Sequence, residues 1–244
     1  MEETVVIGCV VKLDRGFPLV RLEDGAELRC KHATSLVKGE RVRAVIAGGY
    51  GAMFAAVEGA EDDRSLGAND LKALHLTEDD SVVGIAASGR TPYVLGALDY
   101  AKSVGALTIA VTCCPGCEAE AHADIAISPA PGPEVITGST RMKSGTAQKM
   151  ILNMLSTGVM VKLGKVYGNL MVDVKASNEK LRERCVRIVR QATGAEDAAA
   201  RAALIETNYA CKPAIVMLLL GVDKTGAETL LTRAHGRVAA ALEG

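Results

Sequence analysis

The sequence predicts an α/β protein in which a parallel sheet with flanking helices is preceded by a short β meander and followed by a small helical bundle. Three observations support this fold class. From Arg43 to Ser128, short apolar runs alternate with helix-like stretches, a pattern typical of a parallel sheet. Residues 4–44 instead combine β-rich runs with turn signals. Residues 179–244 have the spacing of amphipathic helices.

Each part of the fold has its own sequence pattern. The meander is expected from β-rich runs at 4–13, 19–22 and 27–30, with turn signals at 14–16 and 24–25 between them. The sheet strands are expected over 42–47, 81–87, 106–112 and 125–128, and helical stretches over 52–59, 68–74, 92–102 and 119–123. Further helices are expected over 145–163, 179–192, 197–205, 213–220 and 225–234.

Composition limits the classes of function. The 244 residues are 49% apolar, enough for a sizeable core, and 28 basic residues balance 29 acidic ones. A neutral chain gives no global electrostatic reason to bind nucleic acid or an anionic membrane. No apolar run approaches a membrane span, and the first residues lack the basic region of a signal peptide, so a cytoplasmic protein is expected. The seven cysteines, an odd number, favour reduced thiols.

The stretch from Ser81 to Tyr93 is the most informative, because an apolar strand gives way to small hydroxyl and glycine residues. Ser88 and Gly89 allow backbone N–H groups to approach a ligand, and Thr91 with Pro92 begins a helix. Helix starts of this kind bind anions, typically phosphate, at the carboxyl ends of sheet strands. An ordinary strand-to-helix turn is the alternative, and it is the commoner outcome for this motif taken alone.

A second cluster of hydroxyl and glycine residues runs from Thr137 to Gln148. Hydroxyls donate and accept hydrogen bonds, which suits sugar hydroxyls and phosphate oxygens, and Arg141 or Lys143 can balance negative charge. N-capping combined with surface charge explains this segment equally well. Two such clusters in one domain suggest a polyhydroxylated, phosphorylated ligand.

Several long segments carry a family resemblance. They are Gly84–Tyr93, Thr137–Lys143, Gly145–Lys149 and Gly164–Asp173, with Ala47–Gly49 and Ala56–Asp62 in addition. The chain closely resembles the N-acetylmuramic acid 6-phosphate etherase family, of the sugar isomerase (SIS) fold, from about residue 43 to residue 244. The resemblance implies an incomplete SIS-type sugar-phosphate domain over 43–178 and a helical bundle over 179–244. Residues 1–42 are expected to form a separate OB-like β segment.

The resemblance also implies an activity, a carbon–oxygen lyase of amino-sugar catabolism in peptidoglycan recycling, without cofactor or metal. The family removes D-lactate from the C3 ether of N-acetylmuramic acid 6-phosphate by elimination across C2 and C3 followed by addition of water. Glu61 matches one of the family's two catalytic glutamates and is the expected base at C2. Without the motif, a solvated acid would be the commoner explanation of Glu61. The residues expected to bind substrate are Ser88, Gly89, Arg90, Thr91, Ser139, Thr140 and Lys143.

Parts of the family pattern are missing. Etherase-like sequence begins near Arg43, so the chain resembles an N-terminally truncated etherase without the acid glutamate and the Gly-Thr-Ser-Gly-Arg motif. Tyr50 stands where the family commonly has Glu. A non-catalytic SIS module that binds amino-sugar phosphates is therefore an alternative.

The N-terminal residues carry a different resemblance. The segments 8–25, 29–34 and 36–40 resemble the N-terminal OB-fold of ribosome-assembly GTPases of the RsgA type, but no P-loop follows. Ribosome or RNA binding is a weaker alternative, against which the neutral charge and few aromatics argue. Because the first strand of a SIS sheet is central, we expect Thr4 to Val11 to replace it, pairing with the strand at 42–47 or 82–87.

Two further expectations concern metals and assembly. Cys114 and Cys117 have the spacing of a zinc knuckle and His122 lies nearby, but no second cysteine pair accompanies them, so no metal is expected. SIS domains of this type commonly complete their sites across a two-fold interface, which implies a homodimer. The apolar helix from Met150 to Met160 suits such an interface.

Overall fold

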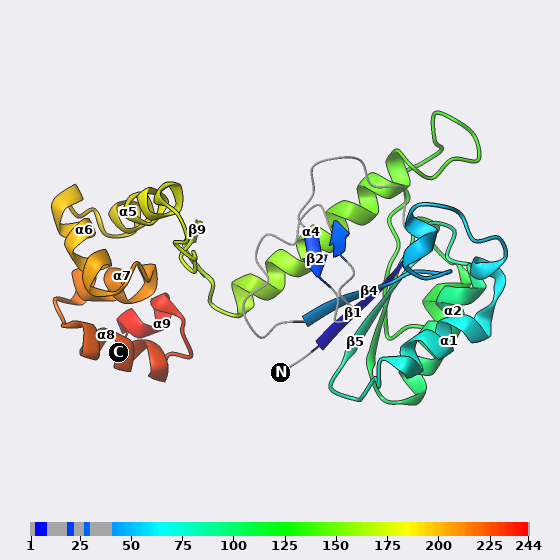
Figure 1. Ribbon diagram of the computed structural model, residues 1–244, viewed down its shortest axis with the longest axis horizontal. Coiled ribbons are helices and arrows are strands. Elements are labelled where there is room, and N and C mark those ends of the chain that lie inside the picture. The colour runs from blue at the N-terminus through cyan, green and yellow to red at the C-terminus, as the bar shows by residue number, and fades with distance from the viewer. Residues whose placement is uncertain (1–2, 9–18, 22–26, 30–40, 244) are drawn as a thin grey trace. The chain divides into compact units, whose positions relative to one another are not determined.

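The computed structural model describes residues 3–8, 19–21, 27–29 and 41–243 (Figure 1). The chain divides into two compact units, Met1–Asn153 and Met154–Gly244. No helix within the described ranges is both long and apolar enough to cross a membrane.

The first unit is α/β and contains all of the predicted catalytic and substrate-binding residues. Its strands are β1 (Glu3–Gly8), β2 (Leu19–Arg21), β3 (Glu27–Arg29), β4 (Arg41–Val45), β5 (Ser81–Ile85), β6 (Leu107–Val111) and β7 (Ile125–Ile127). Its helices are the 3-10 turns η1 (Tyr50–Met53) and η2 (Ala60–Asp62), then α1 (Arg64–Ala73), α2 (Pro92–Ser103), α3 (Glu118–Ala121) and the first half of α4 (Lys143–Lys162).

Five parallel strands form the main sheet in the order β4-β1-β5-β6-β7. β1 is an interior strand next to the edge strand β4, with Ile7 opposite Val45 of β4 on one side and Gly84 of β5 on the other. The expectation that the run from Thr4 to Val11 pairs with the strand at 42–47 or with the strand at 82–87 is confirmed, because β1 pairs with both β4 and β5.

The prediction of an antiparallel N-terminal meander is wrong for its first strand, β1. β2 and β3 pair antiparallel with each other as expected, but β1 joins the parallel sheet instead. Parallel pairing requires a long crossover, and residues 9–40 between β1 and β4 are long enough to provide one. The turn at 14–16 lies outside the described residues.

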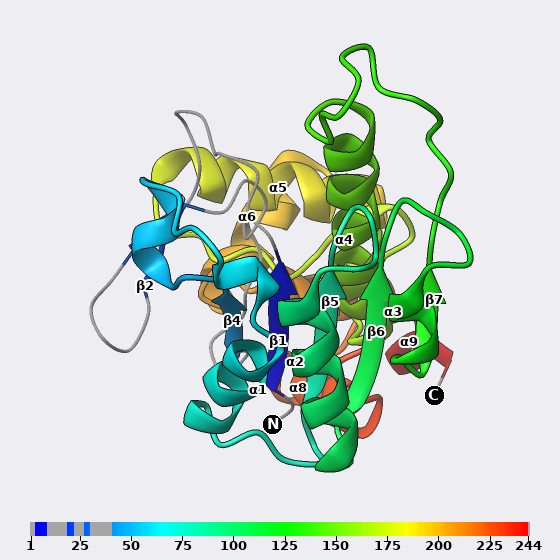
Figure 2. The same cartoon turned by 90° about the vertical axis from the view of Figure 1, so that its right-hand side faces the viewer.

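Helices cover both sides of this sheet. α1 and α2 lie together on one side, and the first half of α4 lies on the other (Figures 1 and 2). Tyr93, Leu98, Leu71 and Val82 are fully buried between the helix pair and the sheet. The α/β class with a helix-flanked parallel sheet is thus as predicted.

The connection between β4 and α1 differs from the expected helix over 52–59. The 3-10 turn η1 is followed by turns, because Gly49 before it and Gly59 after it adopt left-handed φ values of 71° and 76°. α1 begins four residues earlier than the expected residue 68, at Arg64. Asp63 explains this start, since its carboxylate accepts hydrogen bonds from the Ser65 and Leu66 N–H groups at 2.8 and 3.1 Å.

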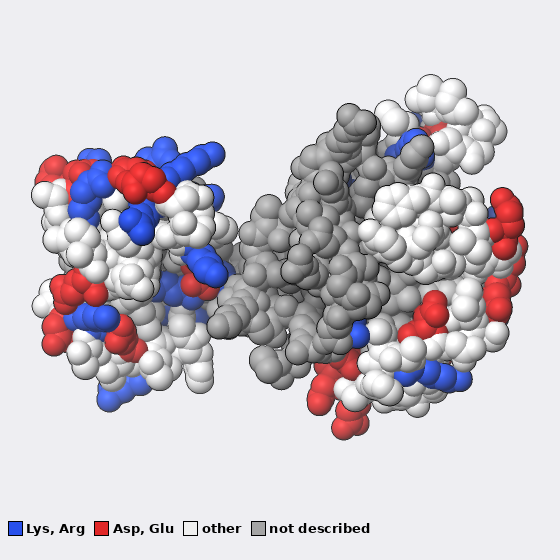
Figure 3. Space-filling model, in the orientation of Figure 1, with Lys and Arg blue, Asp and Glu red and all other residues white. Residues whose placement is uncertain are grey.

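The second unit is mostly helical. It contains a short hairpin of β8 (Val166–Tyr167) and β9 (Leu170–Met171), then α5 (Glu179–Thr193), α6 (Asp197–Glu206), α7 (Cys211–Leu220), α8 (Lys224–Arg233) and α9 (Val238–Glu243). The sequence predicted α5 to α8 but neither the hairpin nor α9. Val189, Leu204 and Ile215 form its core, and Figure 3 shows charges of both signs interspersed on the visible face of this unit.

Candidate functional site

The order of strands locates the binding region of the sheet. The chain runs from β1 to β4 on one side and from β5 to β6 on the other, so the direction of strand addition reverses between β1 and β5. Open α/β sheets bind ligands outside the carboxyl ends of the strands at such a switch point. Here Gly8 is opposite Ile85, and the Ser88 loop follows immediately.

The loop from Ser88 to Thr91, called the cradle below, connects β5 to α2. The Gly89 N–H donates to the Ala86 carbonyl at 3.1 Å, and the Ser88 hydroxyl accepts from the Arg90 N–H at 3.3 Å. Ser88 and Arg90 are exposed. Thr91, the N-cap of α2, makes no side-chain capping bond, which leaves the first N–H groups of the helix without that partner. This arrangement suits an anion.

The cradle is supported by the loop that follows β6. The Cys113 N–H donates to the Ala87 carbonyl at 2.9 Å, and the Ala119 N–H donates to the Gly89 carbonyl at 2.9 Å. Gly89 has a left-handed φ of 63°, and a β-carbon placed on it would lie 2.1 Å from the Cys117 sulfur. The loop after β6 therefore contacts Gly89 closely enough to require glycine there.

The second cluster lies at the start of α4. The Ser139 hydroxyl accepts from the Arg141 N–H at 3.3 Å, and the Glu134 carboxylate accepts from the Lys143 and Ser144 N–H groups at 3.1 Å each. These bonds hold the pKa of Glu134 below its usual value, with the Lys143 N–H as the largest contribution. Glu134 thus stabilises the helix start that presents Lys143.

Sequence reasoning missed Glu134. Capping patterns place the acid within about three residues of the helix start, whereas Glu134 precedes Lys143 by nine positions. The proline-rich segment before it gave no indication that its chain would turn back toward α4.

Cys113 brings the two clusters together. Its N–H bonds to Ala87, next to Ser88, while its sulfur lies 3.6 Å from the Ser144 carbonyl, next to Lys143. The predicted residues of the cradle and those at 139–143 therefore flank one loop at the carboxyl edge of the sheet.

Glu61 lies on the separate turn η2. Ala60 is buried in the core of the first unit and η2 contacts α2, while the Glu61 side chain is exposed. Its neighbour Asp63 has a structural role as the cap of α1, and its hydrogen bonds, first that of the Ser65 hydroxyl, lower its pKa. The acidic run at 61–63 is thus divided between an exposed carboxylate and a helix cap.

A hollow of about 230 Å³ lies beside the end of β4. It is lined by Ala44, Val45, Ile46, Gly49, Tyr50, Asp70, Ala73 and Leu74. Tyr50, where the etherase resemblance leads one to expect Glu, is therefore at a concave surface.

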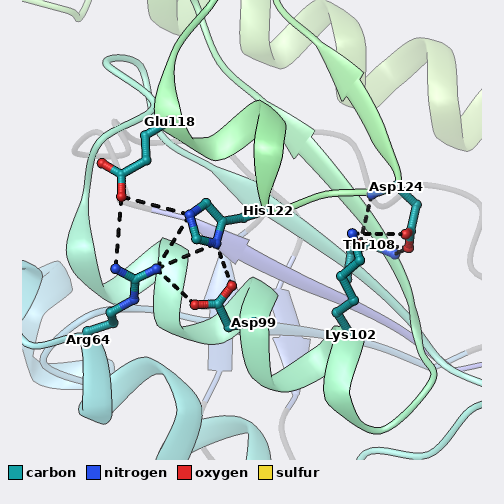
Figure 4. Close-up of polar contacts among 7 residues, drawn as sticks. All are labelled: Arg64, Asp99, Lys102, Thr108, Glu118, His122 and Asp124. Atoms are coloured by element: carbon teal, nitrogen blue, oxygen red, sulfur yellow. Dashed lines mark hydrogen bonds and ion pairs between the residues drawn. The ribbon is translucent and has the colours of Figure 1, made fainter.

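A network of polar side chains connects the helices α1, α2 and α3 (Figure 4). Asp99 binds Arg64 at 2.8 Å and also binds His122, and Glu118 lies 3.9 Å from Arg64. Burial alone would raise the pKa of Asp99, but the bonds from His122 and Arg64 outweigh it and lower the pKa. His122 is thus engaged with α2, and no group of metal-ligating side chains is found in the described part of the chain.

Comparison with known proteins gives the family. Residues 29–102 match the glucokinase regulatory protein N-terminal SIS domain, and residues 168–215 match the C-terminal lid domain of that protein. An N-acetylmuramic acid 6-phosphate etherase from Serratia proteamaculans (strain 568) is 60% identical over 198 residues, which span 81% of this chain and 67% of the relative. The chain belongs to the N-acetylmuramic acid 6-phosphate etherase family.

Other relatives agree with this etherase assignment. The etherase from Enterobacter sp. (strain 638) is 58% identical over 202 residues, 83% of this chain and 68% of its own length. Among solved structures, a provisionally named phosphosugar isomerase from Clostridium difficile 630 has a TM-score of 0.40 at 12% identity, covering 84% of this chain and 48% of its own. The resemblance to the etherase family, and with it a SIS domain, is confirmed by the sequence relatives and the SIS match.

Proposed function

We propose that this protein is a lyase that cleaves the D-lactyl ether of N-acetylmuramic acid 6-phosphate, giving N-acetylglucosamine 6-phosphate and D-lactate. The observation that carries the proposal is the 60% identity over 198 residues to a relative named for this substrate. We place the enzyme in the cytoplasm, as part of amino-sugar catabolism.

The sugar phosphate is bound between the two hydroxyl clusters. The backbone N–H groups at the start of α2 and the exposed Ser88 hydroxyl suit phosphate oxygens. The exposed Lys143, at the start of α4, supplies positive charge. The residues assigned to substrate binding are Ser88, Gly89, Arg90, Thr91, Ser139, Thr140 and Lys143.

Glu61 is the catalytic base. In the open-chain sugar the C2 proton lies next to the aldehyde and is acidic enough for a carboxylate to remove. Loss of D-lactate from C3 then gives an unsaturated sugar, and water adds at C3. An exposed carboxylate on a turn that packs against α2 can meet a substrate from the solvent side.

A homodimer completes the proposal. α4 exposes Met150 and Met154, with 55% and 62% of their surface accessible, and their spacing of four residues places them on one face of the helix. Burying them against a second copy would remove this apolar surface from water. Sedimentation or light scattering of the purified chain measures the mass directly, and a monomer at micromolar concentration would contradict this part.

The test is enzymatic release of D-lactate from N-acetylmuramic acid 6-phosphate, followed with a D-lactate dehydrogenase. We expect release by the wild-type chain and a loss of about 10²- to 10⁴-fold in Glu61→Gln, the usual contribution of a general base. Asp62→Asn, a change of the adjacent exposed acid, is the matched control and should retain activity. Thermal stabilisation by the sugar phosphate without lactate release would indicate a non-catalytic SIS module instead.

A further inference from the structure

Three thiols lie in the loop that supports the cradle, and the proposed reaction uses none of them. Cys114 is exposed, while Cys113 and Cys117 are half-buried, and all three are free. An accessible thiol next to a second one is the usual arrangement of a cysteine pair that reacts with oxidants.

The backbone between Cys114 and Cys117 has the geometry of a tight turn. Gly116 has a φ of 75°, close to the value of about 80° at the third position of a type II turn, where glycine is preferred. Pro115 occupies the second position, which favours proline. The first and fourth Cα atoms of such a turn lie within about 7 Å, and a disulfide spans Cα atoms about 4.4–6.8 Å apart. The turn therefore brings the two cysteines within reach of each other.

The sulfur of Cys117 also contacts the cradle. It lies against the Gly89 α-carbon, where a β-carbon would be 2.1 Å away, and its thiol donates to the Thr112 hydroxyl at 3.5 Å. Two residues later, the Ala119 N–H holds the Gly89 carbonyl at 2.9 Å. A rotation of Cys117 toward Cys114 would break the sulfur's contacts with Gly89 and Thr112.

We propose that Cys114 and Cys117 form a reversible disulfide that loosens the neighbouring cradle. The oxidant is a small disulfide such as glutathione disulfide. The exposed Cys114 thiolate attacks it, forming a mixed disulfide and releasing one glutathione thiolate, and the Cys117 thiolate then attacks the Cys114 sulfur and releases the second. Two protein thiols are oxidised, one glutathione disulfide is reduced to two thiols, and the two protein protons pass to the released thiolates. The consequence for sugar-phosphate binding rests on the proposed function.

A second pair of thiols, in the second unit, is buried and therefore less reactive than Cys114 and Cys117. Cys185 and Cys211 lie in the core of the second unit, 0% and 1% exposed. Burial raises the pKa of both thiols, which disfavours the reactive thiolate. These two cysteines should remain reduced under conditions that oxidise the loop, and they serve as an internal control.

The test treats the purified full chain with glutathione disulfide, blocks free thiols by alkylation and maps linked peptides by mass spectrometry. We expect a Cys114–Cys117 link, reversed by dithiothreitol. Hydrogen exchange of the peptide covering 86–91 should then be at least about tenfold faster, since opening the supporting contacts exposes its amides. Cys114→Ser should give no such link and no change in exchange, whereas Cys113→Ser, the matched control, should behave as wild type.

Each result decides a part of the proposal. Oxidation that leaves Cys114 and Cys117 unlinked, or links either to another cysteine, overturns the disulfide. A link without faster exchange over 86–91 overturns the effect on the cradle. Peptide mapping and hydrogen exchange are both independent of catalysis. If the reduced chain released no D-lactate, the proposed function would be refuted, but the disulfide proposal would still be decided by these two measurements.

Discussion

At the scale of single residues, Gly89 is held by two constraints at once. Its φ of 63° is costly for any residue with a β-carbon, and that β-carbon would overlap the Cys117 sulfur. We expect Gly89→Ala to lower the free energy of unfolding by about 2–4 kcal/mol, combining backbone strain with overpacking. Sugar-phosphate affinity should fall with it, measured by calorimetric titration.

Gly194 provides the control for the backbone part of this effect. It has a similar φ of 73° at the end of α5, but nothing lies within 4 Å of the β-carbon position. Gly194→Ala should cost about 1 kcal/mol in urea unfolding and leave ligand affinity unchanged. Equal losses in the two variants would show that contact with Cys117 is unimportant.

Glu134 gives a residue-scale prediction about pH. Its folded pKa lies below the usual 4.5, so its stabilisation of the α4 start is present above about pH 4.5 and is lost as pH falls through the lower, folded pKa. The amide NMR shifts of Lys143 and Ser144 should therefore change on acidification. In Glu134→Gln, whose amide does not ionise, this titration should be absent. If the amide shifts still changed with pH in Glu134→Gln, a group other than Glu134 would be responsible for the change.

At the scale of elements, α1 and α2 depend on two glycines where they cross. A β-carbon on Gly67 would lie 2.0 Å from the Tyr93 carbonyl oxygen, and one on Gly96 would lie 1.9 Å from that of Arg64. Because both obstacles are backbone, neither can move aside as a flexible side chain could. Alanine at either position should separate the helices and destabilise the first unit by about 1–3 kcal/mol or more in thermal unfolding.

The same substitution should have the opposite sign elsewhere. Gly158 lies inside α4 with nothing within 4 Å of its β-carbon position. Gly158→Ala should therefore be neutral or stabilising by up to about 1 kcal/mol, because alanine has the higher helix propensity. If it destabilised as much as Gly67→Ala, helix crossing would not be the cause.

Local patterns predicted most elements because their determinants are local. α2 follows from Pro92 at its first position, and α5 from Asn178, whose side chain accepts from the Leu181 N–H at 3.0 Å. The turns after η1 were misjudged although their cause is local, because Gly49 and Gly59 adopt positive φ values in a stretch with helix-like composition. The cradle was found because its residues are adjacent in sequence. Glu134 was missed because nine residues separate it from Lys143, beyond the range of capping patterns. Cys117 was missed because it meets the cradle through the loop after β6, which lies farther along the chain.

At the scale of the whole molecule, the position of β1 could be argued only from the resemblance. Its own residues predict a strand but not its neighbours, since pairing is decided by which edges remain open. The SIS sheet needs a strand at this interior position, and β1 occupies it between β4 and β5. The first described strand of the chain thus contributes to the sheet that carries the cradle.

This interior position makes β1 sensitive to proline. A strand bonded along both edges has no N–H to spare, so Val6→Pro removes a ladder hydrogen bond wherever that N–H points. We expect a loss of about 3 kcal/mol or more, followed by calorimetry, together with loss of the protected amides of β5 in hydrogen exchange. Val20→Pro, in the two-stranded pair of β2 and β3, should be much milder because the main sheet does not depend on it. Comparable damage from both would mean that the first unit requires the β2–β3 pair as much as it requires β1.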